Sequence, residues 1–280
     1  MQDKLNILRI VCLDAQGLVA KVSSILAKHH CNIVENDEFV DADSGHFFMR
    51  SAFTGSVSPQ SLISEVETAL PANAHIECFP QRKKRIVVLA TKEAHCLGDL
   101  LVRSLFDDIY AEVLAVISNH ETLGEMTRNL GFPYHCVSHK GVDRSGHEEQ
   151  VMSAIDQYNP DYIVMAKYMR ILSESFIDRY KNRIVNIHHS FLPAFIGANP
   201  YRQAYERGVK LIGATAHFAT VDLDEGPIIA QGTVPANHTH SVKDMVRNGR
   251  DVEKEVLARA LHLVFEDRVF VHGNQTIVFE

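Results

Sequence analysis

The sequence predicts an α/β protein in two parts, a small βαββαβ unit followed by a larger unit with a mostly parallel sheet. Strand and helix patterns alternate through the first eighty residues in the order strand, helix, strand, strand, helix, strand. After Pro80, short continuous apolar runs alternate with helical patterns, which is typical of βαβ units. At 280 residues the chain also suits two cores, because domains usually have ~100–150 residues.

The amino-terminal unit, placed at residues 1–83, is predicted from its strand and helix patterns in order. Strand-forming runs stand at Leu5–Leu13, Cys31–Phe39, His46–Phe53 and Ala74–Phe79. Apolar residues repeat on one helix face at Leu18, Val22, Ile25 and Leu26, and again at Leu62, Val66 and Leu70. Asp14 is expected to cap the first helix, and Ser58 before Pro59 the second. This order makes a four-stranded sheet with both helices on one side.

The larger unit, residues 84–280, is predicted from strands that are buried on both faces. Apolar runs of this kind stand at Ile86–Ala90, Val113–Ile117 and Tyr162–Met165. Helical patterns cover Leu97–Phe106, Thr122–Leu130, Glu148–Gln157 and Val242–Phe265. A terminal pair of strands is expected over Arg268–Phe279.

Composition and charge exclude several classes of partner. The net charge is -7 and the pI about 6.1, so no nucleic-acid partner is expected, and the basic cluster Arg82–Arg85 is interpreted as a solvated linker. The amino-terminal segment is unlike a secretory signal, and no apolar stretch approaches the ~20 residues that span a bilayer. The 5 cysteines show no CxxC spacing, which favours free thiols in a reducing compartment. We therefore expect a cytoplasmic protein with no membrane partner.

Polar side chains gather in two segments beside strong strand patterns. In the first, Asn186, His188 and Ser190 point the same way if the chain is extended. An amide and an imidazole on one face can bind a developing oxyanion and manage a proton, although both could simply satisfy backbone groups near a turn. In the second, a strand carrying Thr215 and His217 leads into an acidic loop. That loop could bind a metal, supply a carboxylate or be a solvated turn.

These segments carry a resemblance to a known family. Asn186–Pro193 (NIHHSFLP) and His217–Pro227 (HFATVDLDEGP) resemble the two signatures of the folate-dependent formyltransferases, and Tyr168–Ser173 (YMRILS) is similar to that family's folate-binding strand end. The first unit, with Asp14 and Gly17 at its first turn, resembles an ACT domain. Together the resemblances imply a Rossmann-like formyltransferase sheet preceded by a ferredoxin-like βαββαβ (ACT) domain.

The resemblance implies roles for the residues of both segments. Asn186, His188 and Asp224 match the catalytic asparagine, histidine and aspartate of the family. Asn186 and protonated His188 would stabilise the oxyanion, and Asp224 would take a proton from the attacking water. His217 is expected to orient Asp224 and stay neutral, or else to be a core residue. Because water or an amine attacks directly, Ser190 is not expected to act as a nucleophile.

The acceptor of the formyl group is predicted to be water. Family members that formylate glycinamide ribonucleotide carry a glycine- and asparagine-rich phosphate loop after their first strand, whereas Thr91–Gly98 has Glu93 and bulky residues. His189, assigned a supporting role, stands where those members tend to have proline. The expected reaction is hydrolysis of 10-formyltetrahydrofolate to formate and tetrahydrofolate. Transfer to an amine such as glycinamide ribonucleotide, and a non-catalytic folate and amino-acid sensor, are the alternatives.

The folate is expected to bind as a substrate, with no prosthetic group. The resemblance places the folate-binding residues at Met169, Arg170, Ile171, Leu172, Thr220, Val221, Asp222 and Leu223. Met165 and Phe176 would add apolar walls or be core residues. No metal is expected, because His238 and His240 have no further ligands at suitable spacing.

The ACT resemblance implies a regulatory unit. Its candidate ligand contacts are Asp14, Gln16, Gly17 and Asn36, and its candidate effectors are glycine and methionine. A dimerisation module that has lost its ligand is the alternative. Pairing of such sheets implies a homo-oligomer, either a dimer or a tetramer.

Overall fold

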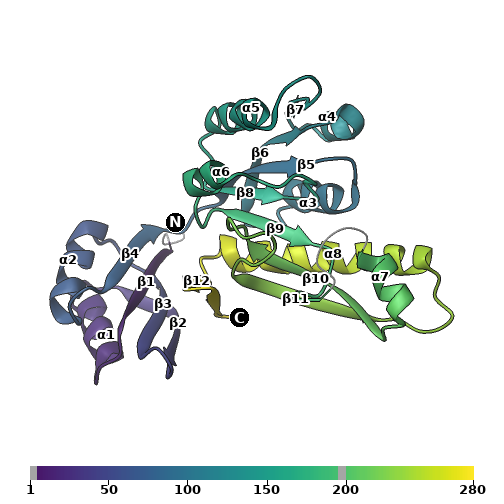
Figure 1. Ribbon diagram of the computed structural model, residues 1–280. Helices are drawn as coiled ribbons and strands as arrows, with labels where there is room; N and C mark the ends of the chain where they lie inside the picture. The colour runs from purple at the N-terminus through teal and green to yellow at the C-terminus, as the bar shows by residue number, and fades with distance from the viewer. Residues whose placement is uncertain (1–4, 195–199) are drawn as a thin grey trace. The chain divides into compact units, whose positions relative to one another are not determined.

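The protein divides into two compact units, seen in a computed structural model (Figure 1). The model describes residues 5–194 and 200–280, so the first four residues of the amino-terminal segment considered above lie outside the description. Unit 1 contains the residues up to Arg82 together with Glu266–Phe270 and Phe279–Glu280. Unit 2 contains Lys83–Phe265 and Val271–Val278.

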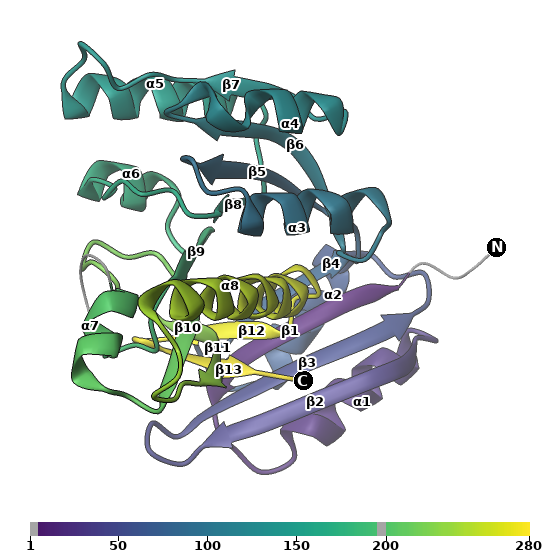
Figure 2. The same cartoon turned by 90° about the vertical axis from the view of Figure 1, so that its right-hand side faces the viewer.

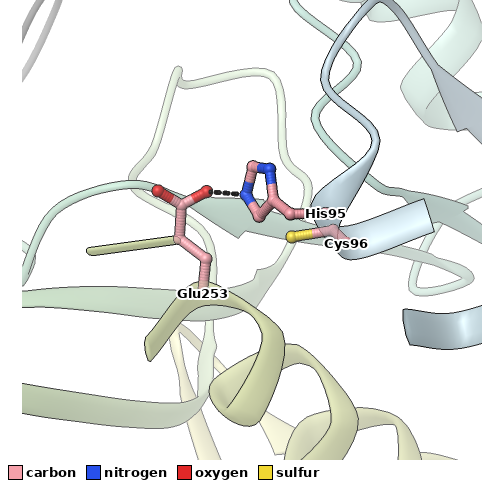
Figure 3. A group of neighbouring side chains, drawn as sticks. All are labelled: His95, Cys96 and Glu253. Atoms are coloured by element: carbon pink, nitrogen blue, oxygen red, sulfur yellow. Dashed lines mark hydrogen bonds and ion pairs between the residues drawn. The ribbon is translucent and has the colours of Figure 1, made fainter. Parts of the chain in front are cut away.

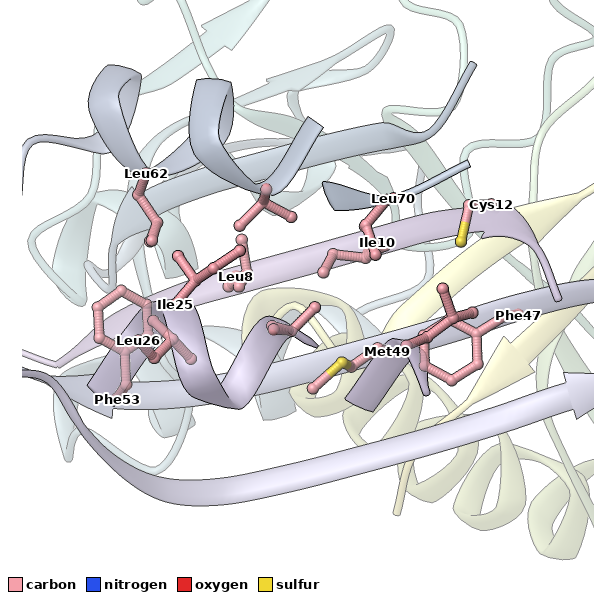
Figure 4. Packing of buried hydrophobic residues seen from close by; sticks show 13 residues of the cluster. Leu8, Ile10, Cys12, Ile25, Leu26, Phe47, Met49, Phe53, Leu62 and Leu70 are labelled. Atoms are coloured by element: carbon pink, nitrogen blue, oxygen red, sulfur yellow. The ribbon is translucent and has the colours of Figure 1, made fainter. Parts of the chain in front are cut away.

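Unit 1 has the predicted βαββαβ order. Its elements are β1 (Asn6–Leu13), α1 (Leu18–Lys28), β2 (Asn32–Asp41), β3 (His46–Thr54), α2 (Pro59–Ala69) and β4 (His75–Pro80). The strands form an antiparallel sheet in the order β2-β3-β1-β4. Alternate residues of β1 and β3, among them Leu8, Ile10 and Met49, pack against Leu26 of α1 and Leu62 of α2 (Figure 4). Both helices therefore cover the same face of the sheet, as the alternation predicts.

The capping of the two helices differs from prediction. Gly17, with φ 82°, is the N-cap of α1 and no side chain caps that helix. The expectation for Asp14 is therefore wrong, because its carboxylate lies three positions before the cap and its backbone N–H bonds instead to the Gly45 carbonyl at 2.9 Å. Ser58 is the N-cap of α2, but its hydroxyl makes no capping bond.

Carboxyl-terminal residues cover the other face of the sheet of unit 1. The ring of Phe270 meets Phe48 edge-on at 5.9 Å between centroids. The buried Arg50 guanidinium donates to Glu35 at 2.5 Å and to the Glu266 carbonyl. Glu35 also accepts from Arg268 at 2.6 Å. Apolar packing and this charge network explain why Glu266–Phe270 belong to unit 1. A single boundary after residue 83 assigns these residues to the second unit instead.

Unit 2 is built on a seven-stranded sheet in the order β11-β10-β9-β8-β5-β6-β7. Its strands are β5 (Lys84–Ala90), β6 (Ala111–Ser118), β7 (Tyr134–Cys136), β8 (Tyr162–Met165), β9 (Ile184–His188), β10 (Leu211–Phe218) and β11 (Ile228–Pro235). The strands from β5 to β9 pair in parallel, whereas β10 runs antiparallel to β9 and β11. The prediction of a mostly parallel sheet is confirmed.

Helices cover both faces of this sheet (Figures 1 and 2). They are α3 (His95–Leu105), η1 (Glu121–Leu123), α4 (Gly124–Asn129), α5 (Arg144–Asp156), α6 (Glu174–Arg179), α7 (Pro200–Arg207) and α8 (Val242–Phe265). Side chains of α5 and α6 pack on the face that carries Val87 and Leu89 of β5. Helix α8 contacts α3 and the strands β9, β10 and β11. A final hairpin consists of β12 (Val269–His272) and β13 (Gln275–Val278).

Several short elements depart from the prediction. The single helix expected over Thr122–Leu130 is divided into η1 and α4. The sequence interpretation missed β7, α6, α7 and β11, which have 3, 6, 8 and 8 residues. The first three complete too few turns or alternations to give a periodic signal.

The topology creates a ligand-binding position at the carboxyl edge of the sheet. Strand β5 is followed by β6 on one side, and the chain later returns to add β8 on the other side. Ligands of open α/β sheets bind at such a switch point, beyond the carboxyl ends of the strands. The polar residues at the ends of β8 and β9 therefore lie where a binding site is expected.

Candidate active site

The pairing of β9 with β10 positions the first polar groups. In this antiparallel pair His217 stands opposite Asn186, and Thr215 opposite His188. Directly opposed residues project their side chains from the same face of a sheet. The register therefore brings Asn186 and His217 together, although 31 positions separate them in sequence.

Asn186 and His217 are joined by a hydrogen bond. The Asn186 side-chain nitrogen lies 3.1 Å from His217 Nε2, and His217 Nδ1 lies 2.9 Å from the Phe218 carbonyl. Because a carbonyl can only accept, Nδ1 carries a proton, and Nε2 of the neutral ring accepts from the amide. His217 Nε2 is 3.8 Å from Asp224, which is too long for a hydrogen bond. The structure thus gives His217 a hydrogen bond with Asn186 and also leaves it beside Asp224, the residue that the sequence interpretation made its partner.

His188 and Asp224 form a buried pair. The distance from His188 Nδ1 to Asp224 Oδ1 is 3.1 Å. Burial acts to raise the pKa of the Asp224 carboxyl, but the hydrogen bond with His188 and the electrostatic influence of the neighbouring His217 outweigh it and hold that pKa well below its usual range. Among the described residues, His188 Nε2 is buried and has no hydrogen-bond partner. The pair therefore presents an ionised carboxylate beside an imidazole whose second nitrogen is available to a ligand.

The loop that carries Asp224 is fixed by close backbone contacts. Asp224 itself has φ 59°, a left-handed conformation that is uncommon outside glycine. Two positions later, a Cβ added to Gly226 would lie 1.9 Å from the Phe218 carbonyl oxygen, so only glycine fits. The Asn274 amide donates to the Glu225 carbonyl at 3.0 Å. These contacts keep the Asp224 carboxylate within hydrogen-bonding distance of the His188 ring.

A cavity of about 670 Å³ opens beside these groups. It is lined by Asn186, His188, His189 and Asp224, together with Met165, Met169, Arg170, Ile171 and Leu223 among the predicted folate-binding side chains. A smaller neighbouring recess of about 40 Å³ adds Leu172, Thr220 and Val221. The apolar side chains at the rim are half exposed, with Met169 and Ile171 at 56% and Leu223 at 49%. An exposed apolar rim around convergent polar groups is typical of a small-molecule binding site.

Three residues that the sequence analysis considered for the site do not line the cavity or the recess. Asp222 is in the same loop but lines neither hollow. Phe176 is fully buried and packs on Tyr180 in the core of unit 2, so it is a core residue. Ser190 lies beyond the end of β9, where strand alternation no longer applies, and its hydroxyl donates to the Ala194 carbonyl at 2.7 Å.

His189 lines the cavity as an uncharged group. Burial, followed by the nearby charge of Lys167, lowers the pKa of His189 to about 4. Its ring lies 5.1 Å from that of His188 and 6.1 Å from that of Tyr201. At neutral pH this imidazole is a neutral wall of the site.

Sequence reasoning missed several polar residues of the cavity wall, among them Lys167, Tyr201 and Glu253. Glu253 is 1% exposed, and Lys167 is 3% exposed. A signal for Glu253 was present, because it shares the face of α8 that carries the buried Val252, Val256 and Leu257. A charged residue within the apolar stripe of a helix is expected to have a buried partner.

The candidate regulatory residues lie in unit 1. Asp14, Gln16 and Gly17 are exposed in the turn between β1 and α1. Asn36 is in β2, where its side-chain oxygen accepts from Ser51 at 2.5 Å. Among the described helices, none is both long and apolar enough to cross a membrane.

Comparison with known proteins decides the family. A formyl transferase family model matches residues 84–261, which is more than half of the chain. The chain belongs to the formyl transferase family. Its relatives include a formyltetrahydrofolate deformylase from Escherichia coli (strain K12), 52% identical over 273 residues and 98% of both chains.

Solved structures of this family are also similar. A formyltetrahydrofolate deformylase from Pseudomonas syringae pv. tomato str. DC3000 matches with a TM-score of 0.94 and 41% identity, over 100% of this chain and 96% of the other. A glycinamide ribonucleotide transformylase 1 from Symbiobacterium toebii matches less well, with a TM-score of 0.69 and 31% identity, over 72% of this chain and 97% of the other. The better match extends over both units.

Proposed function

We propose that this chain is a formyltetrahydrofolate deformylase, which hydrolyses 10-formyltetrahydrofolate to formate and tetrahydrofolate. The observation that carries the proposal is the convergence of Asn186, His188 and Asp224 on one cavity, with His188 Nε2 unpartnered among the described residues. An N-formyl group is an acyl donor, so its hydrolysis needs a site for a developing oxyanion and a group that moves a proton. These three side chains supply both.

The geometry suggests how the steps are divided. The Asn186 amide, held by His217, and His188 Nε2 donate to the formyl oxygen as water adds to the carbon. The Asp224 carboxylate fixes the His188 ring through Nδ1 and accepts the proton of the attacking water. The contacts that hold the pKa of Asp224 low make it an acid that readily gives the proton on to the departing folate nitrogen. The bond from the formyl carbon to that nitrogen then breaks.

The folate is proposed to enter between two backbone segments. Residues 170–172, 219–221 and 223 line the smaller recess, where their backbone groups would pair with the ring of the pterin. Met165 lines both hollows and gives each an apolar wall. No prosthetic group is needed for the reaction, and the substrate itself is the only folate proposed to bind.

The wall opposite the folate favours water over an amine acceptor. Glu93 lines the cavity and pairs with Arg250 at 3.2 Å. A carboxylate at this position repels a phosphate group, and no glycine-rich cradle precedes α3, which begins at His95. An acceptor such as glycinamide ribonucleotide would therefore have no glycine-rich phosphate loop to bind it here.

Incubation of the purified protein with 10-formyltetrahydrofolate alone tests the proposal. Hydrolysis predicts formate and tetrahydrofolate in equal amounts without any added amine. Turnover that needs glycinamide ribonucleotide would instead indicate a transferase, and binding without turnover would indicate a sensor. The assay should be repeated after exhaustive chelation, where full activity is expected.

For unit 1 we propose regulation by a small amino acid, glycine or methionine, bound near Asp14, Gln16, Gly17 and Asn36. The support is the resemblance of this unit to an ACT domain and the exposed turn after β1. We also propose that the cytoplasmic enzyme is a dimer or tetramer. Titration calorimetry with each amino acid tests the first point, and the absence of heat with both would leave unit 1 as a dimerisation module.

A further inference from the structure

A second polar cluster lies in the wall of the cavity, outside the proposed catalytic groups. Its centre is the buried carboxylate of Glu253 on α8. One oxygen lies 2.8 Å from His95 Nε2 and 3.1 Å from Lys167 Nζ, and the other accepts from the Tyr201 hydroxyl. Figure 3 shows the contact between Glu253 and His95. The cluster joins α3, α7, α8 and the chain after β8.

Packing alone does not explain this cluster. A buried ion pair is often replaced by apolar residues without loss of stability, so Lys167 and Glu253 are not required for a core. Lys167 also has φ 63°, a conformation that is costly for a residue with a side chain. Backbone strain of this kind occurs preferentially at functional sites. Because Lys167, Tyr201 and Glu253 all line the cavity, their function concerns what the cavity holds.

The cluster is poorly suited to a metal ion. His95, Cys96 and Glu253 lie close enough to share one, with ligand atoms within 4.8 Å of one another (Figure 3). However, the Lys167 ammonium already occupies the same carboxylate and would repel a cation. Burial, and then the charge of Glu253, raises the pKa of the Cys96 thiol, so the thiol stays protonated and is a weak ligand.

We propose that Glu253 is a specificity-determining residue, which favours water over an amine as the acceptor of the formyl group. Its two oxygens bind His95, Lys167 and Tyr201. Lys167 and Tyr201 line the cavity, so Glu253 uses polar groups that an amine substrate would need for its own binding. A site whose polar groups are already paired with one another holds a polar ligand weakly, whereas a water molecule needs no such anchor. This inference rests on the proposed deformylase activity and assigns the choice of acceptor to a residue outside Asn186, His188 and Asp224.

The partition of the formyl group between water and an amine tests the inference. Enzyme, 10-formyltetrahydrofolate and a high concentration of glycinamide are incubated, and formate and N-formylglycinamide are both quantified. In the transfer reaction the bond from formyl carbon to folate nitrogen breaks, a bond to the amine nitrogen forms, and one amine proton passes to the folate nitrogen. The ratio of the two products does not depend on how much of the enzyme is folded.

Glu253→Ala should shift this ratio towards N-formylglycinamide by about tenfold or more, because it frees Lys167 and His95 and opens space. Glu253→Gln keeps the shape of the side chain and one accepting oxygen, so its shift should be smaller. Asp251→Ala is the matched control on the same helix, because Asp251 is 67% exposed and forms a surface ion pair with Lys254 at 2.8 Å. Its ratio should equal that of the wild type.

If Glu253→Ala does not fold, Tyr201→Phe removes a single hydroxyl and should shift the ratio in the same direction by about threefold. A ratio within twofold of the wild type in folded Glu253→Ala overturns the inference. If Glu253→Ala does not fold, the same result in Tyr201→Phe overturns it. A shift in Asp251→Ala as large as that in Glu253→Ala does the same. A wild type that releases no formate at all would contradict the proposed function itself, which is a separate result.

Discussion

At the scale of single residues, the proposed site depends on two pairs of side chains, His188 with Asp224 and Asn186 with His217. Asn186, His188 and Asp224 were found from motifs, and the structure brings His188 and Asp224 within 3.1 Å. The sequence interpretation paired His217 with Asp224, and the structure adds a hydrogen bond between His217 and Asn186. That pairing depends on the register of two strands 31 positions apart, which no local pattern specifies.

Asn186→Ala removes one donor to the proposed oxyanion. We expect kcat to fall by ~10²–10³-fold, which is the usual cost of losing one such donor. Stopped-assay measurement of formate release gives kcat, and the melting temperature shows that the fold is kept. A loss smaller than about tenfold would mean that the amide only positions the substrate.

At the scale of elements, long periodic segments were predicted well and contacts between helices were not. The bounds of α8 agree with the expected Val242–Phe265, because its apolar face repeats over 24 residues. The buried charge on that face, Glu253, was missed because its partners come from α3, α7 and the end of β8. Patterns within one segment give no information on such contacts.

Substitution of glycine by alanine should have opposite effects on stability at Gly249, where α7 packs on α8, and at Gly98. A Cβ at Gly249 would lie 2.2–2.3 Å from the Tyr201 ring, which is fixed by its bond to Glu253. A Cβ at Gly98 in α3 meets nothing within 4 Å. Urea unfolding should show that Gly249→Ala is destabilised by ~1–3 kcal/mol, while Gly98→Ala gains ~0.5–1 kcal/mol from helix propensity. Equal effects would contradict this packing.

The charge cluster on α8 also predicts a dependence of stability on pH. Burial acts to raise the pKa of Glu253, but hydrogen bonds from His95 and Tyr201 and the charge of Lys167 lower it from 4.5 to about 2. A depressed pKa in the folded state stabilises the protein above pH 4.5, and this stability is lost as the pH falls towards 2. The difference corresponds to about 3 kcal/mol.

Glu253→Gln should remove that dependence. Free energies of unfolding measured in urea between pH 3 and pH 7 should therefore rise less steeply with pH in the variant than in the wild type. Parallel curves would show that the carboxylate gains no stabilisation from its three partners.

At the scale of the whole molecule, the sequence predicted both units and their order. It did not predict that carboxyl-terminal residues pack on the sheet of unit 1. This packing depends on the contacts of Phe270 with Phe48 and of Arg268 with Glu35. No pattern in the sequence around Phe270 or Arg268 indicates these contacts. The edge strand β2 leaves Phe39 and Val40 more than 40% exposed. Apolar side chains on a sheet edge support the proposed pairing of two copies.

Phe39→Asp should therefore weaken the oligomer. Light scattering should give a smaller mass than for the wild type, because a charge is placed on the proposed interface. Phe106→Asp is a control with the same chemical change at a residue that is 73% exposed at the end of α3. An unchanged mass in Phe39→Asp would place the contact between copies elsewhere.

The arrangement of three side chains around one formyl carbon is tested most directly by a crystal structure with a non-hydrolysable 10-formyl folate analogue. The formyl oxygen should lie ~3 Å from both the Asn186 amide nitrogen and His188 Nε2, with room for a water between the formyl carbon and Asp224. A formyl group bound out of reach of any one of these side chains would contradict the account.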